Sequence, residues 1–203
     1  MPVSFVVKRV DHRRKHRHDA AMSDPELATR IERLEAESAI RALAARYCFA
    51  IDNHDLDEVV RLFTPNARVR SVDGVMDAVG RHAIADQFRG RFAVLGPSNH
   101  VSHDHWIRID AGGRSAMGTL SAHAELWRHE RTMITALRYE DRYERHEGVW
   151  MIAERVLSFL YYVPLSDYPQ ILGMRDRMRA YEKPLPADYP ENLPSWHDYR
   201  DAE

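Results

Sequence analysis

The chain has 203 residues, of which 30% are charged and 44% hydrophobic, a composition typical of a globular domain with a sizeable core. The formal net charge of −2 excludes an overall basic surface for nucleic acid. The absence of any apolar run of about 18 residues excludes a membrane span. The single cysteine, Cys48, excludes an internal disulfide, so we expect a reducing, cytoplasmic location.

The first 22 residues differ in charge from the rest of the chain. Residues 1–21 contain six Lys or Arg and two Asp, which gives a formal charge of +4, and three His are interleaved with them. We interpret residues 1–22 as a disordered basic extension, because runs of like charge are usually solvated. A transit peptide, or a metal- or nucleic-acid-binding run, is the alternative. From Ser23 a capping box with Glu26 predicts the start of a helix.

Three helices are predicted before residue 97. The apolar stripe of the first changes face near Ser38, which indicates a bend or a break between two helices. Asp55 is the expected N-cap of a second, short helix. The third helix is expected after Gly80 and ends at Gly96-Pro97, since both residue types interrupt helices.

The remainder of the domain has the alternation and turn residues of antiparallel strands. Two short strands are expected around Asp73-Gly74, followed by long strands over residues 100–109, 115–127, 132–145 and 149–163. Helices followed by a meander predict an α+β domain over residues 23–163, with the helices on one face of a curved antiparallel sheet. Residues 164–203 are rich in proline and tyrosine, and we expect this tail to pack on the domain or on a neighbouring subunit.

Four polar residues lie where a buried pocket would need them. Tyr47 and Asp52 end an apolar helix, His100 begins a strand, and Arg155 interrupts an apolar strand face. Each is costly in a core unless it is paired. Together they supply an imidazole base, a carboxylate to orient it, and two donors for developing negative charge. This set predicts acid–base chemistry on a small molecule; a core histidine bonded to a buried aspartate for structure is the alternative.

Strand alternation places further residues relative to Arg155. An ideal strand gives Arg155 an inner face shared with Met151, Ala153, Leu157 and Phe159. An arginine there needs a carboxylate, a substrate or solvent in the cavity. The opposite face is expected to carry Ile134, Ile152 and Val156 and to need a partner.

Two motifs are more specific than these patterns. They are the Tyr47-x4-Asp52 pair before Leu-Phe-Thr-Pro-Asn-Ala, and the Glu-Gly-Val-Trp hairpin at residues 147–150. With the order of elements, they resemble the SnoaL-like branch of the nuclear transport factor 2-like superfamily from about Ser23 to Pro164. The resemblance implies a cone-shaped barrel in which the N-terminal helices enclose an apolar pocket.

This superfamily hosts many functions, so the site must decide which one applies. Its members include scytalone dehydratase, hexachlorocyclohexane dehydrochlorinase, bile-acid 7α-dehydratase, polyketide cyclases, ketosteroid isomerase and the non-catalytic small subunit of ring-hydroxylating dioxygenases. By resemblance, His100 matches the general base, Asp52 its carboxylate partner, Tyr47 a pocket tyrosine and Arg155 a residue that assists the leaving group. These matches imply a cofactor-independent lyase acting on a small hydrophobic cyclic substrate. An isomerase or cyclase with the same base, or a non-catalytic subunit or binding module, is the alternative.

A second set of residues is expected to bind the substrate. Ser121 and His123 share one strand face, and Trp106, Tyr139 and Phe159 are aromatic residues suited to a cyclic ligand. The alternative is a solvent-facing position for Ser121 and His123, and a core position for the aromatic residues.

No cofactor or metal is expected. No phosphate-binding glycine loop or dinucleotide fingerprint is present. His100, His103 and His105 suggest a metal site at first, but a straight strand puts His103 and His105 on one face and His100 on the other. No matching carboxylate motif or cysteine pair accompanies them.

The expected partners are the small cyclic molecule and other copies of the chain. The apolar outer sheet face predicts a homo-oligomer, a trimer or a dimer, because leaving it in water forfeits about 25 cal/mol per Å² of buriable surface. Nucleic acid and membrane are not expected partners.

Overall fold

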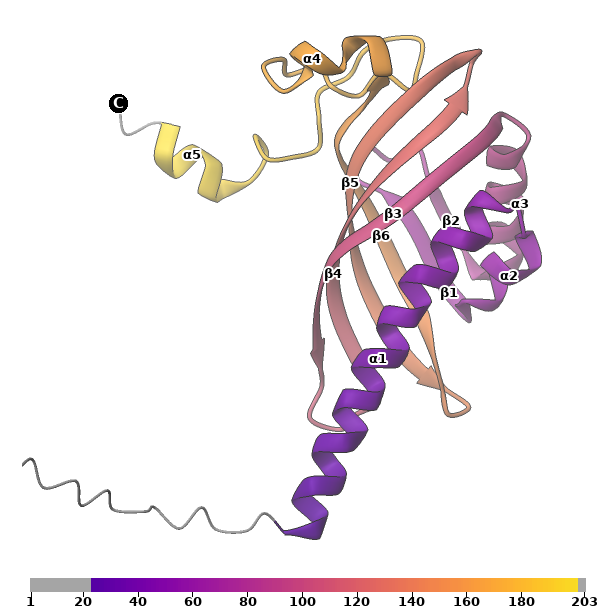
Figure 1. Ribbon diagram of the computed structural model, residues 1–203, viewed down its shortest axis with the longest axis vertical. Helices are drawn as coiled ribbons and strands as arrows, with labels where there is room; N and C mark the ends of the chain where they lie inside the picture. The colour runs from indigo at the N-terminus through magenta and orange to yellow at the C-terminus, as the bar shows by residue number, and fades with distance from the viewer. Residues whose placement is uncertain (1–22, 201–203) are drawn as a thin grey trace, which may run out of the picture.

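Three helices cover a six-stranded sheet in the computed structural model, which describes residues 23–200 (Figure 1). Two of them precede the sheet, and the third lies between its second and third strands. The helices are α1 (Asp24–Asp52), α2 (Leu56–Arg61) and α3 (Gly80–Phe92). The basic extension predicted for residues 1–22 lies outside the described residues. Within residues 23–200, no helix is long and apolar enough to cross a membrane.

Helix α1 is one unbroken helix of 29 residues, so the predicted break near Ser38 is wrong. The predicted capping box between Ser23 and Glu26 is present. The apolar face shifts because only the second half of α1 packs on the sheet: buried residues begin at Ala36, whereas Leu27 is 45% exposed. Figure 1 shows the N-terminal end of α1 extending past the end of the sheet.

The sheet has the strand order β2-β1-β6-β5-β4-β3. The strands are β1 (Phe63–Ser71), β2 (Asp77–Val79), β3 (Leu95–Ile109), β4 (Ser115–Arg128), β5 (Arg131–His146) and β6 (Val149–Pro164). All neighbours pair antiparallel except β1 and β6, which are parallel. The predicted α+β class with a curved sheet beneath N-terminal helices is confirmed. The curved sheet is not closed, because β2 and β3 are free edges.

A register shift in β3 changes which histidines face the core. Pairing with β4 slips between Ser102 and His105, so that His100 lies opposite Ala124 and His105 opposite Leu120. Both β4 residues are in the main core. The straight-strand expectation that His100 and His105 lie on opposite faces is therefore wrong, because a bulge reverses the alternation.

A second register shift acts in the same way in β6. Pairing with β5 slips between Tyr143 and Arg142, which lie opposite Ile152 and Glu154. Ile152 consequently belongs to the main core and is fully buried, in correction of its expected outer position. Met151 is only partly buried and lies outside that core, so it does not share the inner face with Arg155.

The outer face of the sheet is partly covered by the chain that follows β6. A 3-10 turn (Leu165–Asp167) leads into the short helix α4 (Tyr168–Ile171). Ile171 of α4 packs with Tyr161 and Val163 in a small second core, and Ile134 packs against this cluster. The tail thus shields one of the apolar positions expected to await a partner.

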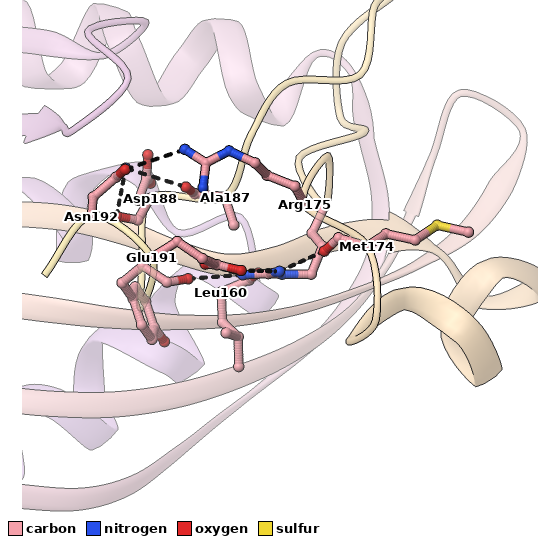
Figure 2. A network of polar contacts seen from close by, with 9 residues as sticks. Leu160, Met174, Arg175, Ala187, Asp188, Glu191 and Asn192 are labelled. Carbon is pink, nitrogen blue, oxygen red and sulfur yellow. Dashed lines mark hydrogen bonds and ion pairs between the residues drawn. The ribbon is translucent and has the colours of Figure 1, made fainter. Parts of the chain in front are cut away.

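The rest of the tail is held against β6 by a buried arginine. Arg177 is 2% exposed, and its guanidinium pairs with both carboxylate oxygens of Glu191 at 2.7 Å. It also donates to the carbonyl oxygens of Leu160 and Met174. Figure 2 shows Leu160, Met174 and Glu191 within one network of polar contacts. A last helix, α5 (Pro194–Arg200), follows. The hydrogen bonds of Arg177 thus hold this part of the tail against β6.

Candidate active site

Asp52 and His100 form a tightly bonded pair between α1 and β3. Asp52 is the last residue of α1, and His100 lies near the start of the long edge strand. Nδ1 of His100 lies 2.6 Å from Oδ1 of Asp52, and the backbone N–H of His100 donates to Oδ2 at 2.8 Å. Ser98 adds a third donor to Asp52, at 2.7 Å. The side chain of His100 is 10% exposed and that of Asp52 is 17% exposed, so the pair is accessible without being solvated.

These hydrogen-bond donors keep Asp52 ionised. Burial acts to raise its pKa, but the hydrogen bonds from the His100 ring, the His100 backbone and Ser98 outweigh burial and lower the pKa. An ionised Asp52 accepts a hydrogen bond from Nδ1–H, which leaves Nε2 of His100 as the unprotonated, basic nitrogen. The structure thus brings together two of the predicted residues in the arrangement that a general base requires.

A small cavity lies against His100, between the helices and the sheet. It is lined by Tyr47, Ile51, Phe88, Arg91, Leu95, His100, Leu126, Thr135, Leu137, Tyr139, Leu157, Phe159 and Tyr162. Its free volume of about 20 Å³ accommodates about one water molecule. A cyclic ligand enters only if lining side chains move, because sites for such ligands have volumes of roughly 300–1,000 Å³.

Arg155 lies behind this cavity, between two of its tyrosines. The guanidinium carbon is 4.3 Å from the ring centroids of both Tyr47 and Tyr139. Two guanidinium nitrogens donate to the two carboxylate oxygens of Asp141, at 2.9 and 2.6 Å, and both side chains are fully buried. Burial acts to lower the pKa of Arg155, but the adjacent carboxylate raises it well above its ordinary value. Arg155 therefore carries a fixed charge.

Tyr143 and His105 extend this pair into a buried network, which we call the Arg155 network (Arg155, Asp141, Tyr143, His105). The Tyr143 hydroxyl donates to Asp141 at 2.6 Å and lies 3.0 Å from Nε2 of His105. Since its single proton goes to Asp141, the hydroxyl oxygen must accept from Nε2–H of His105. Burial lowers the pKa of His105, which matches a neutral ring.

Two atoms of the Arg155 network have no partner among the described residues. They are Nη1 of Arg155 and Nδ1 of His105, both buried. Orphaned buried polar atoms are rare and costly, and they often mark a place where a ligand or water binds. Nη1 of Arg155 is therefore a free donor beside two tyrosines that line the cavity.

Not all of the expected substrate-binding residues reach this cavity. Tyr139 and Phe159 line it. Ser121, His123 and Trp106 do not, in correction of the expected pocket lining. On β4 the neighbours of Ser121 and His123 are buried instead, so these two side chains point outward, and Trp106 is 62% exposed. His123 bonds to His103 on that outer surface, at 2.8 Å.

Sequence reasoning missed the partners of the predicted residues. Asp141 has the strand parity of Tyr139 and Tyr143, and a charge on an aromatic inner face was the available signal. Ser98 precedes His100 by two residues, which is the spacing of one strand face. Arg91 gave no signal, because α3 contains three arginines and the sequence does not indicate which of them faces the cavity.

A curved, unclosed sheet beneath N-terminal helices is the architecture of the nuclear transport factor 2-like class. The chain belongs to the SnoaL-like domain family, whose model matches residues 32–156. A search of the curated proteins finds no significant match.

Solved structures of the same fold include three informative neighbours. LinA has a TM-score of 0.63 and 18% identity, over 68% of this chain and 95% of its own. A scytalone dehydratase-like protein from Novosphingobium aromaticivorans DSM 12444 has a TM-score of 0.62 and 18% identity, over 66% and 91%. The hexachlorocyclohexane dehydrochlorinase LinA-type3 from Novosphingobium barchaimii LL02 has a TM-score of 0.62 and 17% identity, over 68% and 94%. At these identities the likeness establishes the fold, and the neighbours include lyases.

Proposed function

We propose that the chain is a cofactor-independent lyase of the dehydratase or dehydrohalogenase type, acting on a small cyclic substrate. The observation that carries the proposal is the 2.6 Å bond between Asp52 and His100 at the edge of an apolar cavity. A core histidine would not need a basic nitrogen at a cavity. The names of the structural neighbours support the same reaction type.

In the proposed reaction, Nε2 of His100 removes a proton from the carbon next to the one that bears a hydroxyl or halide. The C–H electron pair becomes the new double bond, and the bond to the leaving group breaks. Asp52 stabilises the imidazolium that forms. A halide leaves as the anion, whereas a hydroxyl takes a proton from the imidazolium or from Tyr47 and leaves as water.

Arg155 and Tyr47 are proposed to stabilise the departing group or an enolate oxygen. Nη1 of Arg155 is a free donor, and Tyr47 lines the cavity against the guanidinium. Burial raises the pKa of Tyr47, while the charge of Arg155 opposes that effect, so the phenol stays protonated and able to donate. Preorganised donors of this kind act strongly in a dry site.

The test is product analysis by mass spectrometry on a panel of cyclic alcohols, halides and ketones. Loss of water or of hydrogen halide supports the lyase, and unchanged mass with a new retention time indicates an isomerase or cyclase using the same base. The His100→Ala variant is the control for each active compound. Absence of turnover and of ligand binding across the panel would favour a non-catalytic subunit.

We also propose that the chain assembles as a homo-oligomer, a trimer or a dimer. The outer sheet face exposes large apolar side chains that include Val101, Trp106 and Met117, at 42%, 62% and 54%. Exposed apolar clusters of this kind are typical of interaction surfaces. Light scattering at micromolar concentration tests this, since a stable particle near the 23.6 kDa chain mass contradicts assembly.

A further inference from the structure

Arg91 stands out among the residues that line the cavity. It lies in the last turn of α3 and is the one arginine or lysine in that lining, within the part of the chain that the structure describes. Its side chain is half-buried. Arg91 and His100 therefore face the same small space from opposite elements, a helix and a strand.

The charge of Arg91 is not neutralised by a carboxylate within residues 23–200. The one hydrogen bond of its guanidinium to a described residue goes to the sulfur of Met76, at 2.7 Å, and a thioether is only a weak acceptor. Arg89 on the same helix differs, because it pairs with Asp86. A half-buried guanidinium without a counter-ion is costly, and a ligand anion removes that cost.

The carboxylates around the cavity are already engaged elsewhere. Asp52 accepts three hydrogen bonds from Ser98 and His100. Asp141 is fully used by Arg155 and Tyr143. The positive charge that remains available to a molecule in the cavity is that of Arg91.

The field of Arg91 reaches the polar groups of the cavity. Burial raises the pKa of Tyr47 and of Tyr139, and the charge of Arg91 opposes this rise at both phenols. Because Tyr47, Arg91 and His100 line one small cavity, an anionic group placed at Arg91 would lie within one small ligand of the other two.

We propose that Arg91 binds a carboxylate of the substrate, so that the site selects an anionic ring compound rather than a purely apolar one. A guanidinium forms two parallel hydrogen bonds with a carboxylate, which fixes the orientation of the ring as well as its position. The ring then lies among the aromatic and aliphatic walls, with its reacting carbon toward His100. The inference rests on the proposed function for the reaction, but anion binding is a separate property of the site.

The experiment compares two probes of the same shape, cyclohexanecarboxylate and cyclohexanecarboxamide, by calorimetric titration. Wild-type protein is expected to bind the carboxylate at least about tenfold more tightly, since charge-assisted bonds are roughly twice as strong as neutral ones. Equal affinity for the two probes, or no binding of the carboxylate at millimolar concentration, overturns the inference. This comparison needs no variant and so does not depend on variant folding.

Two variants then assign the preference to one residue. Arg91→Gln is expected to reduce the carboxylate preference to near unity, whereas Arg89→Gln, which removes the same charge from the same helix, keeps it. A preference that survives in Arg91→Gln overturns the assignment. If Arg91→Gln melts early, Arg91→Lys replaces it and is expected to keep a reduced preference, because it retains the charge without the two-pronged geometry.

The lyase proposal is tested separately, by turnover rather than by binding. His100→Ala is expected to lower turnover by about 10²- to 10⁴-fold while retaining the carboxylate preference. If wild-type protein shows the preference but no elimination, the lyase proposal fails and the anion site stands. If elimination occurs on uncharged rings with no carboxylate preference, the anion site fails and the lyase stands.

Discussion

The Asp52–His100 pair and the Arg155 network use the same device, a carboxylate that holds a nitrogen base or cation, in two different environments. Asp52 and His100 are 17% and 10% exposed and meet a cavity, whereas Asp141 and Arg155 are both fully buried. A proton can therefore reach and leave the first pair, while the charges of the second are permanent. Accessibility, rather than residue type, therefore separates a group that transfers protons from a group that supplies a fixed electric field.

The largest expected effect is on turnover, at the accessible pair. His100→Ala is expected to lower kcat by about 10²- to 10⁴-fold, because it removes the general base, with the melting temperature close to that of wild type. Asp52→Asn should act in the same direction, since it destabilises the imidazolium. His103→Ala, on the outer face of the same strand, is the matched control. If His100→Ala unfolds the protein instead, the core-histidine alternative is right.

The next effect is on stability, at the buried network. Asp141→Ala leaves the charge of Arg155 buried and unpaired, so we expect the free energy of unfolding to fall by about 3–5 kcal/mol. Urea denaturation measures the change. Glu140→Ala, the neighbouring residue on the exposed face, is expected to change it by less than about 0.5 kcal/mol. If Asp141→Ala and Glu140→Ala lose similar amounts of unfolding free energy, Asp141 does not hold a buried charge in place. The contrast between the Arg155 network and the accessible pair would then be wrong.

A smaller loss is expected at the next member of the network. Tyr143→Phe removes one hydrogen bond to the charged Asp141 and the acceptor for His105, which should cost about 1.5–3 kcal/mol of unfolding free energy. The same denaturation experiment tests it. A variant as stable as wild type would show that the hydroxyl does not connect His105 to the carboxylate.

The smallest effect is on pH dependence, at His105. Its pKa lies below the ordinary value of 6.5 in the folded protein, so the unfolded chain takes up a proton first as the pH falls. The contribution of neutral His105 to stability is therefore present above pH 6.5 and is lost as the pH drops toward the folded pKa. His105→Gln should flatten the loss of unfolding free energy between about pH 7 and pH 5. Equal slopes in the two proteins, or a flattening as large in the exposed His82→Gln, contradict this.

The order of helices and strands was predictable because it depends on local signals. Capping at Ser23 and Asp55 and the breaks in alternation marked by glycine are short-range features, and the structure places helices and strands accordingly. The bounds were less accurate. For example, β3 begins at Leu95, a residue that the sequence analysis assigned to the preceding helix.

The site was predictable only in its single residues, and not in their connections. His100 and Asp52 lie 48 positions apart, and only the resemblance to the SnoaL-like family connected them in the sequence analysis. Asp141 was not found, since a lone Asp among alternating residues reads as solvent-facing. The outward positions of Ser121 and His123 could have been predicted, because the alternate residues of β4 that are buried are all Ala, Gly or Leu.

The register shifts in β3 and β6 each absorb one extra residue. Between Ser102 and His105 two residues of β3 face one residue of β4, so deleting one of the two would restore regular pairing and keep His100 and His105 on the inner face. The same holds for Ala153, which is the extra residue in β6. A residue inserted or deleted elsewhere in either strand would instead exchange the interior row of side chains beyond that point for the exterior row. The bulges are therefore the places where these strands tolerate a change of length without a change in the pocket.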